Sequence, residues 1–264
     1  MSRISAVFAA LNHKKALIPY ITAGDPDLNT TLQLMHTLVE NGADIIELGV
    51  PFSDPSADGV VIQRAATRAV AKGISLRNVL QVVSDFRKTN TTTPVMLMGY
   101  LNPIHRMGYA EFAQAAATAG VDGVLTVDCP IEEISALNQS LKPAGVDCIC
   151  LISPVTPPER IQAIAQEASG FVYYVSLNGV TGAANLDVES VAKQVALIKQ
   201  YVPLPLGVGF GIRDAASARA VAAVADAVIV GSRLVQAIED NPQQETTAVA
   251  AIVKELNQAV QTAV

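Results

Sequence analysis

Apolar residues along the chain gather into short runs that are separated by longer amphipathic segments. Short apolar runs bounded by turn residues predict β-strands, and apolar residues spaced three and four positions apart predict helices. The predicted strands cover 16–22, 44–49, 94–99, 121–127, 146–152, 170–176, 204–208 and 226–230. The predicted helices cover 4–11, 61–72, 75–88, 109–119, 131–141, 159–168, 188–200, 214–224, 233–239 and 245–261, and one more carries Leu28, Leu32, Met35 and Val39 on one face and ends at Asn41-Gly42.

Eight apolar strands that alternate with helices predict an α/β protein built as a single (β/α)8 barrel, the TIM-barrel architecture. We expect residues 1–264 to form one domain, because no linker, low-complexity stretch or change of composition divides the chain. The helix 4–11 before the first strand and the short helix 233–239 after the eighth are additions to the repeat. A doubly wound sheet is the alternative, but it predicts a dinucleotide fingerprint after the first strand, and Ala23-Gly24-Asp25-Pro26 is not one.

The strand 44–49 carries a carboxylate inside an otherwise apolar run. Its period-two geometry places Glu47 with Ile45 and Gly49 on one face, and Ile46 and Leu48 on the other. A strand that is apolar on both faces belongs in a parallel sheet covered by helices, where an ionised carboxylate is costly to bury without a partner. Glu47 is therefore either paired structurally or retained for chemistry, and its position favours chemistry.

Polar residues follow several of the predicted strands. Asp54 and Asp58 flank a short proline-containing segment, which is typical of a solvated loop with an Asx turn. The position of Asp58 at the strand-end face, soon after Glu47, favours a functional role for it. Tyr173 has the pattern of an ordinary strand aromatic. Other residues just past strand ends, each typical of a turn or cap, are Asp25, Tyr100, Asn102 and Asp128.

Glycine-bearing loops follow the sixth, seventh and eighth strands, at Gly179-Val-Thr-Gly182, Gly209-Phe-Gly211 and Gly231-Ser232. In a barrel these loops lie side by side on the face where the strands end. Glycines let backbone N–H groups approach an anion, and the short helix that begins near Ser232 directs its positive end towards it. Each loop alone is typical of a turn, but together they predict a phosphate site.

Composition narrows the class of ligand. The chain has 18 basic and 24 acidic residues, a net charge of −6, and no cluster of Lys and Arg, so neither a nucleic acid nor an anionic membrane is expected as a partner. No apolar run reaches the length of a membrane span, and the helix 4–11 is not followed by a signal-peptide cleavage site. We therefore expect a small-molecule ligand.

Histidine and cysteine spacing predicts no metal site. His13, His36 and His105 lie too far apart in the sequence to suggest a ligand set. The three cysteines are odd in number, and Cys148 and Cys150 are expected on opposite faces of one strand, where they cannot easily form a bridge. Reduced cysteines that serve packing predict a cytoplasmic protein.

Blocks distributed along nearly the whole chain carry a resemblance to a known family. They are Thr22-Ala-Gly-Asp-Pro26, Glu47-Leu-Gly-Val-Pro-Phe-Ser-Asp54-Pro, Ala57-Asp58-Gly59, Gly179-Val-Thr-Gly182, Gly209-Phe-Gly-Ile212 and Gly231-Ser232. In this order they resemble the tryptophan synthase alpha subunit family, and the segment 47–59 is highly specific to it. The resemblance implies cleavage of indole-3-glycerol phosphate to indole and glyceraldehyde 3-phosphate in the biosynthesis of L-tryptophan.

The resemblance also implies roles for individual residues. Glu47 and Asp58 are its catalytic carboxylates, with Tyr173 beside Glu47, and Thr181 helps to close the site over Asp58. The implied phosphate-binding residues are Gly182, Gly211, Gly231 and Ser232, and we expect Tyr100 to contact the substrate as well. The family often has a basic residue where this chain has Leu177, so a polar latch at that position is not expected.

The residue types fit the implied chemistry, which requires neither a metal nor an organic cofactor. A retro-aldol cleavage must protonate the indole carbon and remove a proton from the adjacent hydroxyl. Glu47, desolvated among apolar neighbours, should have a raised pKa and serve both steps, whereas Asp58 on a more polar loop should stay ionised and hold the indole N–H.

Three functional alternatives follow. The first is a lyase that works with a pyridoxal-phosphate-dependent tryptophan synthase beta subunit, as an alpha2beta2 heterotetramer, and the resemblance favours this one. The second is a free-standing lyase of the same family. The third is an inactive barrel that binds a phosphometabolite and activates a partner, and the intact Glu47 and Asp58 argue against it.

Overall fold

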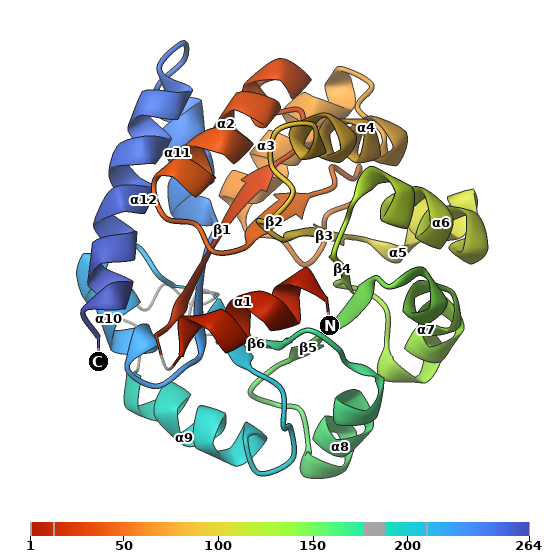
Figure 1. Ribbon diagram of the computed structural model, residues 1–264, viewed down its shortest axis with the longest axis vertical. Helices are drawn as coiled ribbons and strands as arrows, with labels where there is room; N and C mark the ends of the chain where they lie inside the picture. Colours follow the sequence, from red (N-terminus) through yellow and green to blue (C-terminus); the bar gives the residue numbers. More distant parts are fainter. Residues whose placement is uncertain (1, 13, 177–187, 210, 264) are drawn as a thin grey trace.

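The computed structural model describes residues 2–12, 14–176, 188–209 and 211–263 and is drawn in Figure 1. A closed barrel of parallel strands forms its centre, in the order β1-β2-β3-β4-β5-β6-β7-β8, and β1 pairs with β8 to complete the ring. The strands are β1 (Ala16–Thr22), β2 (Ile46–Gly49), β3 (Val95–Gly99), β4 (Gly123–Thr126), β5 (Asp147–Ile152), β6 (Val172–Val175), β7 (Leu206–Gly209) and β8 (Ala227–Val230). This closure excludes the doubly wound sheet and confirms the barrel.

Helices surround the barrel, as Figure 1 shows. They are α1 (Arg3–Leu11), α2 (Leu28–Glu40), α3 (Val60–Ala71), α4 (Leu76–Arg87), α5 (Leu101–Met107), α6 (Tyr109–Ala119), α7 (Ile131–Ala144), α8 (Pro158–Glu167), α9 (Val188–Ile198), α10 (Ala215–Ala222), α11 (Ser232–Asp240) and α12 (Glu245–Gln261). The expected helices before β1 and directly after β8 are both present, as α1 and α11. Within the part of the chain that the structure describes, every helix is too short or too polar to traverse a bilayer.

Helix α5 was not expected from the sequence. This segment, which follows β3, contains Pro103. Pro103 is the third residue of α5, and a proline in the first turn is tolerated because the N–H that it lacks would have no partner within the helix.

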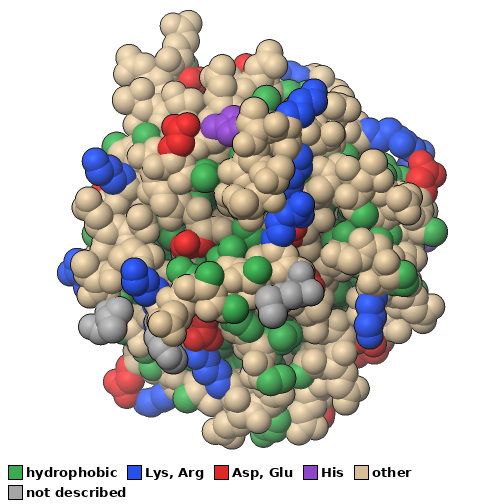
Figure 2. Space-filling model, viewed as in Figure 1, with side chains coloured by type: hydrophobic (Ala, Val, Ile, Leu, Met, Phe, Trp, Pro, Cys, Tyr) green, Lys and Arg blue, Asp and Glu red, His purple; other side chains and the backbone are tan. Residues whose placement is uncertain are grey.

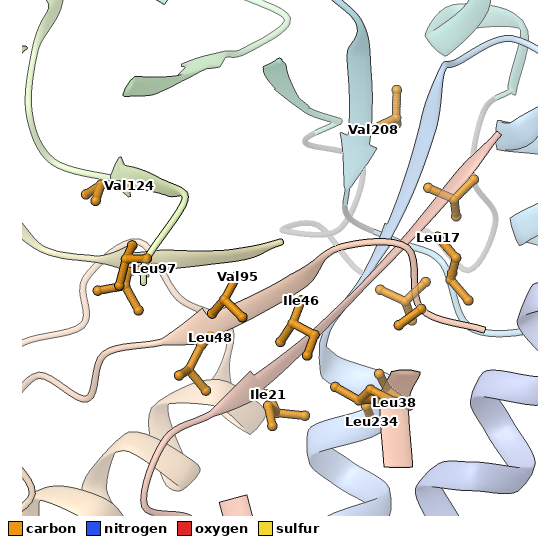
Figure 3. Packing of buried hydrophobic residues seen from close by; sticks show 14 of the residues in the cluster. Leu17, Ile21, Leu38, Ile46, Leu48, Val95, Leu97, Val124, Val208 and Leu234 are labelled. Atoms are coloured by element: carbon orange, nitrogen blue, oxygen red, sulfur yellow. The ribbon is translucent and has the colours of Figure 1, made fainter. Parts of the chain in front are cut away.

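Alternation along the strands divides the core into two layers. Ile46 and Leu48 of β2 face outwards and pack with the helices, in the large outer cluster of which Figure 3 shows a part. Ile45, on the opposite face, belongs to a smaller cluster inside the barrel together with Phe171 and Ile229. The predicted division of β2 into two faces is therefore confirmed, and Glu47 shares the inner face with Ile45.

Helix α1 packs across one end of the barrel interior. Its apolar residues, among them Ile4 and Phe8, pack on the inner cluster, and the ring of Phe8 lies 5.9 Å from that of Phe171. In Figure 1 this helix crosses in front of the strands. The helix therefore covers the end of the barrel opposite the loops that follow the strands.

The prediction that Cys148 and Cys150 lie on opposite faces is wrong. Both belong to the outer cluster, because residues two positions apart in a strand point to the same side. They remain free thiols, as does Cys129.

Candidate active site

Glu47 lies inside the barrel and is only 1 % exposed. Burial is the main cause that raises its pKa, to about 8, and the negative charge of Asp58 raises it further. Among the described residues, its Oε1 atom has no hydrogen-bond partner. A carboxylic acid in this state retains its proton near neutral pH and is able to give that proton to a ligand.

Asp58 lies in the loop between β2 and α3, two residues before the first residue of α3. Its Oδ2 atom accepts a hydrogen bond of 3.0 Å from the hydroxyl of Tyr100. Partial burial raises the pKa of Asp58, and the bond from Tyr100 opposes this shift by stabilising the charged form. The surroundings of Asp58 are thus less polar than the loop sequence suggested, and the hydrogen bond from Tyr100 offsets part of the effect of burial on its pKa.

Tyr100, directly after β3, holds the Asp58 loop at more than one point. Its hydroxyl also accepts a hydrogen bond of 3.0 Å from the backbone N–H of Ala57, and its ring stacks on Phe52 at 5.0 Å. The side chain is 4 % exposed, so its orientation is fixed by packing. The sequence predicted that Tyr100 would contact the substrate, and the structure brings it into direct contact with Asp58.

Two further tyrosines lie within the barrel mouth. Tyr173 is buried, and burial first, then the charge of Glu47, raise the pKa of its hydroxyl well above its usual value. Tyr20 on β1 stands beside Glu47 in the strand register, and its hydroxyl lies 3.2 Å from Oγ1 of Thr22. Sequence reasoning missed Tyr20, although its place on the inner face, two residues before the end of β1, was a usable signal.

Glycines make room for both of these tyrosine hydroxyls. A Cβ atom at Gly49 would lie 2.1 Å from the Tyr20 oxygen, and one at Gly209 would lie 2.2 Å from the Tyr173 oxygen. Both distances are far below van der Waals contact, so glycine is required at each position while the tyrosine is present.

A cavity of about 1110 Å³ opens at the ends of the strands and brings these groups together. Glu47, Asp58, Gly211 and Ser232 all line it. Thr181 and Gly182, which were expected in the same site, lie outside the described residues. The cavity is large enough for a substrate that has both an aromatic ring and a phosphate.

Three residues that were predicted to bind phosphate, Gly211, Gly231 and Ser232, follow β7 and β8 in the chain. Gly211 has a φ of +78°, in the region that favours glycine. Gly231 is the N-cap of α11, and both Gly231 and Ser232, the first residue of that helix, line the cavity. The first N–H groups of a helix have no partner within the helix and can bind an anion. The structure thus places these three predicted residues on the cavity.

Other polar residues at strand ends make local contacts, and of those named next only Asp128 has the cap role that the sequence indicated. Asp54 accepts a hydrogen bond from Ser53 at 2.6 Å, and Asp128 accepts one from the N–H of Leu101, the first residue of α5, at 2.7 Å. Asp25 forms an ion pair with Arg68 at 2.7 Å. Among the described residues, no group of His, Cys, Asp or Glu is suited to hold a metal ion.

A family model described as "Tryptophan synthase alpha chain" matches residues 8–264 of this chain. The chain belongs to the tryptophan synthase alpha chain family. The tryptophan synthase alpha chain of Neisseria meningitidis is 65 % identical over 260 residues, which cover 98 % of this chain and all of that relative. That of Chromobacterium violaceum is 60 % identical over 261 residues, with 98 % and 100 % covered.

Solved structures extend the similarity to the fold of the tryptophan synthase alpha chain. The alpha subunit of Legionella pneumophila superposes with a TM-score of 0.92 at 46 % identity, and 98 % of each chain is covered. A chain from the tryptophan synthase complex of Pyrococcus furiosus has a TM-score of 0.83 at 36 % identity, with 92 % of this chain and 98 % of that chain covered.

Membership of the tryptophan synthase alpha chain family confirms the resemblance found in the sequence. The protein is a lyase of tryptophan biosynthesis that cleaves indole-3-glycerol phosphate. The free-standing lyase and the inactive activator are not favoured by this membership.

Proposed function

We propose that Glu47 and Asp58 carry out the retro-aldol cleavage of indole-3-glycerol phosphate to indole and glyceraldehyde 3-phosphate. The observation that carries this proposal is the pair itself: a buried Glu47 with a pKa of about 8, whose charge state is coupled to that of Asp58, on one cavity. Environments that give two carboxylates different proton affinities are typical of acid–base sites.

Protonated Glu47 gives its proton to the indole carbon that bears the glyceryl chain, and the ring nitrogen becomes positively charged. Asp58 accepts the indole N–H hydrogen bond and stabilises that charge. Glu47, now a carboxylate, removes the proton from the adjacent hydroxyl while the carbon–carbon bond breaks. The electron pair of that bond returns to the indole ring, the hydroxyl becomes the aldehyde, and Glu47 is protonated again.

The phosphate end of the substrate is assigned to the loops after β7 and β8. Backbone N–H groups near Gly211, Gly231 and Ser232 bind its oxygens, aided by the positive end of α11. Thr181 and Gly182 complete this side of the site by the family resemblance. Tyr173 packs beside Glu47, and Tyr100 orients Asp58 through its 3.0 Å hydrogen bond.

The proposal includes a partner. The solved relatives include the tryptophan synthase complex of Pyrococcus furiosus and the tryptophan synthase of Mycobacterium tuberculosis in its aminoacrylate-bound form. These relatives support assembly with a second subunit, which the family resemblance implies is a pyridoxal-phosphate-dependent beta subunit in an alpha2beta2 heterotetramer. One domain over 1–264 and a cytoplasmic location with free cysteines belong to the same proposal.

The test is an assay of indole release by the purified protein, with and without an added beta-type subunit. We expect indole and glyceraldehyde 3-phosphate in equal amounts. We also expect a higher kcat when the partner is present, because a partner that binds more tightly to the protein with its active site closed shifts the population towards that state. Equal rates with a saturating partner would support the free-standing lyase. Absence of indole release under both conditions would reject the proposed function.

A further inference from the structure

A cluster of charged residues joins α3 to α11 and to the loop after β1. Arg68 of α3 binds Asp25 through two bonds, Nε to Oδ1 at 2.8 Å and Nη2 to Oδ2 at 2.7 Å. Its third nitrogen, Nη1, donates to Oε1 of Glu239 on α11 at 2.9 Å. Arg64, one turn earlier on α3, binds the same Glu239 at 2.7 Å and the side-chain oxygen of Gln236 at 3.0 Å.

Each of the three segments in this cluster lies within a few residues of one that lines the cavity. Helix α3 starts two residues after Asp58, and α11 starts at Ser232 on the anion side. Asp25 follows β1, which ends three residues earlier at Thr22 and carries Tyr20. The carboxylate side and the anion side of the cavity are therefore connected through the Arg68 guanidinium.

Arg68 is the centre of this cluster because its three nitrogens contact two acidic residues at once. Asp25 has a side chain that is 3 % exposed, so its charge depends on Arg68 for compensation. A planar guanidinium matches a carboxylate through parallel bonds, and a lysine ammonium lacks that geometry. The contact therefore fixes the direction of α3 as well as neutralising a charge.

We propose that Arg68 is a positioning residue that sets the distance between Asp58 and the anion site at the start of α11. The substrate occupies both ends of the cavity at once, so a shift of α3 relative to α11 misplaces its ring whenever its phosphate is bound. This inference rests on the proposed function, since it assumes a substrate that has an aromatic ring and a phosphate.

The decisive comparison is between the two-ended substrate and a ligand that occupies one end. In Arg68→Met we expect kcat/KM for indole-3-glycerol phosphate to fall by about 10-fold to 10²-fold, because small displacements of reacting groups cost that much. Inorganic phosphate occupies only the anion end of the cavity. It should inhibit the variant and the wild type with inhibition constants within about twofold of each other, because the substitution does not change the contacts of the anion site itself.

Two variants act as controls. Arg77→Met removes an ion pair of 2.6 Å with Glu111 between exposed side chains of α4 and α6, and should leave both constants unchanged. Arg68→Lys keeps the charge without the parallel bonds and should recover only part of the lost kcat/KM. If Arg68→Met does not fold, Arg68→Lys and Glu239→Gln take its place, with the same pattern and a smaller loss.

The outcomes separate the proposal from its rivals. A folded Arg68→Met with a lower Tm but wild-type kcat/KM well below that Tm makes the cluster purely structural and overturns the proposal. Equal loss of substrate turnover and phosphate binding shows a general collapse of the site and also overturns it. Failure of the wild type to cleave the substrate would reject the proposed function instead, and is seen before any variant is made.

Discussion

The hydroxyl of Tyr100 donates a hydrogen bond of 3.0 Å to Oδ2 of Asp58, across 42 positions of the sequence. Because this bond stabilises the charged carboxylate, it lowers the pKa of Asp58 against the effect of burial. Tyr100→Phe keeps the ring that stacks on Phe52 but removes the bond. We expect kcat/KM to fall by about tenfold, and the acid limb of its pH profile to move to higher pH.

Tyr109→Phe is the matched control for this change, since Tyr109 lies on α6 and contacts His105. It should leave both the rate and the profile unchanged. An unshifted acid limb in Tyr100→Phe would show that the hydrogen bond does not govern the ionisation of Asp58.

The second prediction concerns proton transfer by Glu47. Glu47→Gln keeps the size of the side chain but cannot carry a proton, so kcat should fall by at least about 10²-fold while ligand affinity stays similar. Cleavage starts from the protonated acid, so the wild-type rate should decline as pH rises through the Glu47 pKa of about 8. That limb should be missing from the residual activity of Glu47→Gln.

Asp58→Asn provides the contrast. An amide oxygen still accepts the indole N–H but carries no charge, so this variant should weaken both the transition state and ligand binding. If a folded Glu47→Gln enzyme turns over near the wild-type rate, Glu47 is a buried structural acid, and the proton carrier is Asp58 or Tyr173.

The third prediction links the same carboxyl to stability. The pKa of Glu47 rises from an ordinary value of 4.5 to about 8 in the folded protein, so the folded state holds a proton that the unfolded state loses. Its contribution to the free energy of unfolding is complete below pH 4.5 and is lost as pH rises through about 8. The slope is at most about 1.4 kcal/mol per pH unit in this window.

Urea unfolding of the wild type and of Glu47→Gln at several pH values between 5 and 8 measures this effect. The amide does not titrate, so the stability of the wild type relative to the variant should decrease steadily towards pH 8. A constant difference across the window would mean that Glu47 titrates alike in the folded and unfolded chains.

The fourth prediction tests the anion site. Gly231→Asp places a carboxylate at the start of α11, where the phosphate oxygens are proposed to bind, so KM should rise strongly in a folded variant. Gly231→Ala is the size control, because a Cβ there would meet Tyr20 at 3.4 Å, an ordinary contact. An unchanged KM in Gly231→Asp removes the assignment.

Periodicity was sufficient to predict the barrel and to place Glu47 on the same face of its strand as Ile45. It depends only on the spacing of residues within one strand, and β2 has the predicted faces. The bond between Tyr100 and Asp58 could not be predicted, because it joins two loops whose approach depends on the packing of whole elements. The error over Cys148 and Cys150 was of a different kind, since the strand geometry already places them on one side.

The lack of room for a side chain at two glycines could not be predicted from the sequence either. Gly49 ended the predicted second strand, and Gly209 was assigned to a phosphate-binding loop. The need for glycine at each position is visible only once the hydroxyls of Tyr20 and Tyr173 are placed against them. The place of Tyr20 near the end of its strand was a usable signal, but its pairing with Glu47 joins two strands and could not be predicted from the sequence.

Helix α1 acts as a plug in the barrel. Phe8 and its apolar neighbours fill the amino end, and the catalytic cavity opens at the carboxyl end of the strands. Among the described residues, α1 covers the amino end of the barrel, so we expect the substrate and both products to pass through the opening at the carboxyl ends of the strands. We therefore expect a partner subunit that takes up the indole directly to contact this opening, where its binding would also alter the entry of the next substrate.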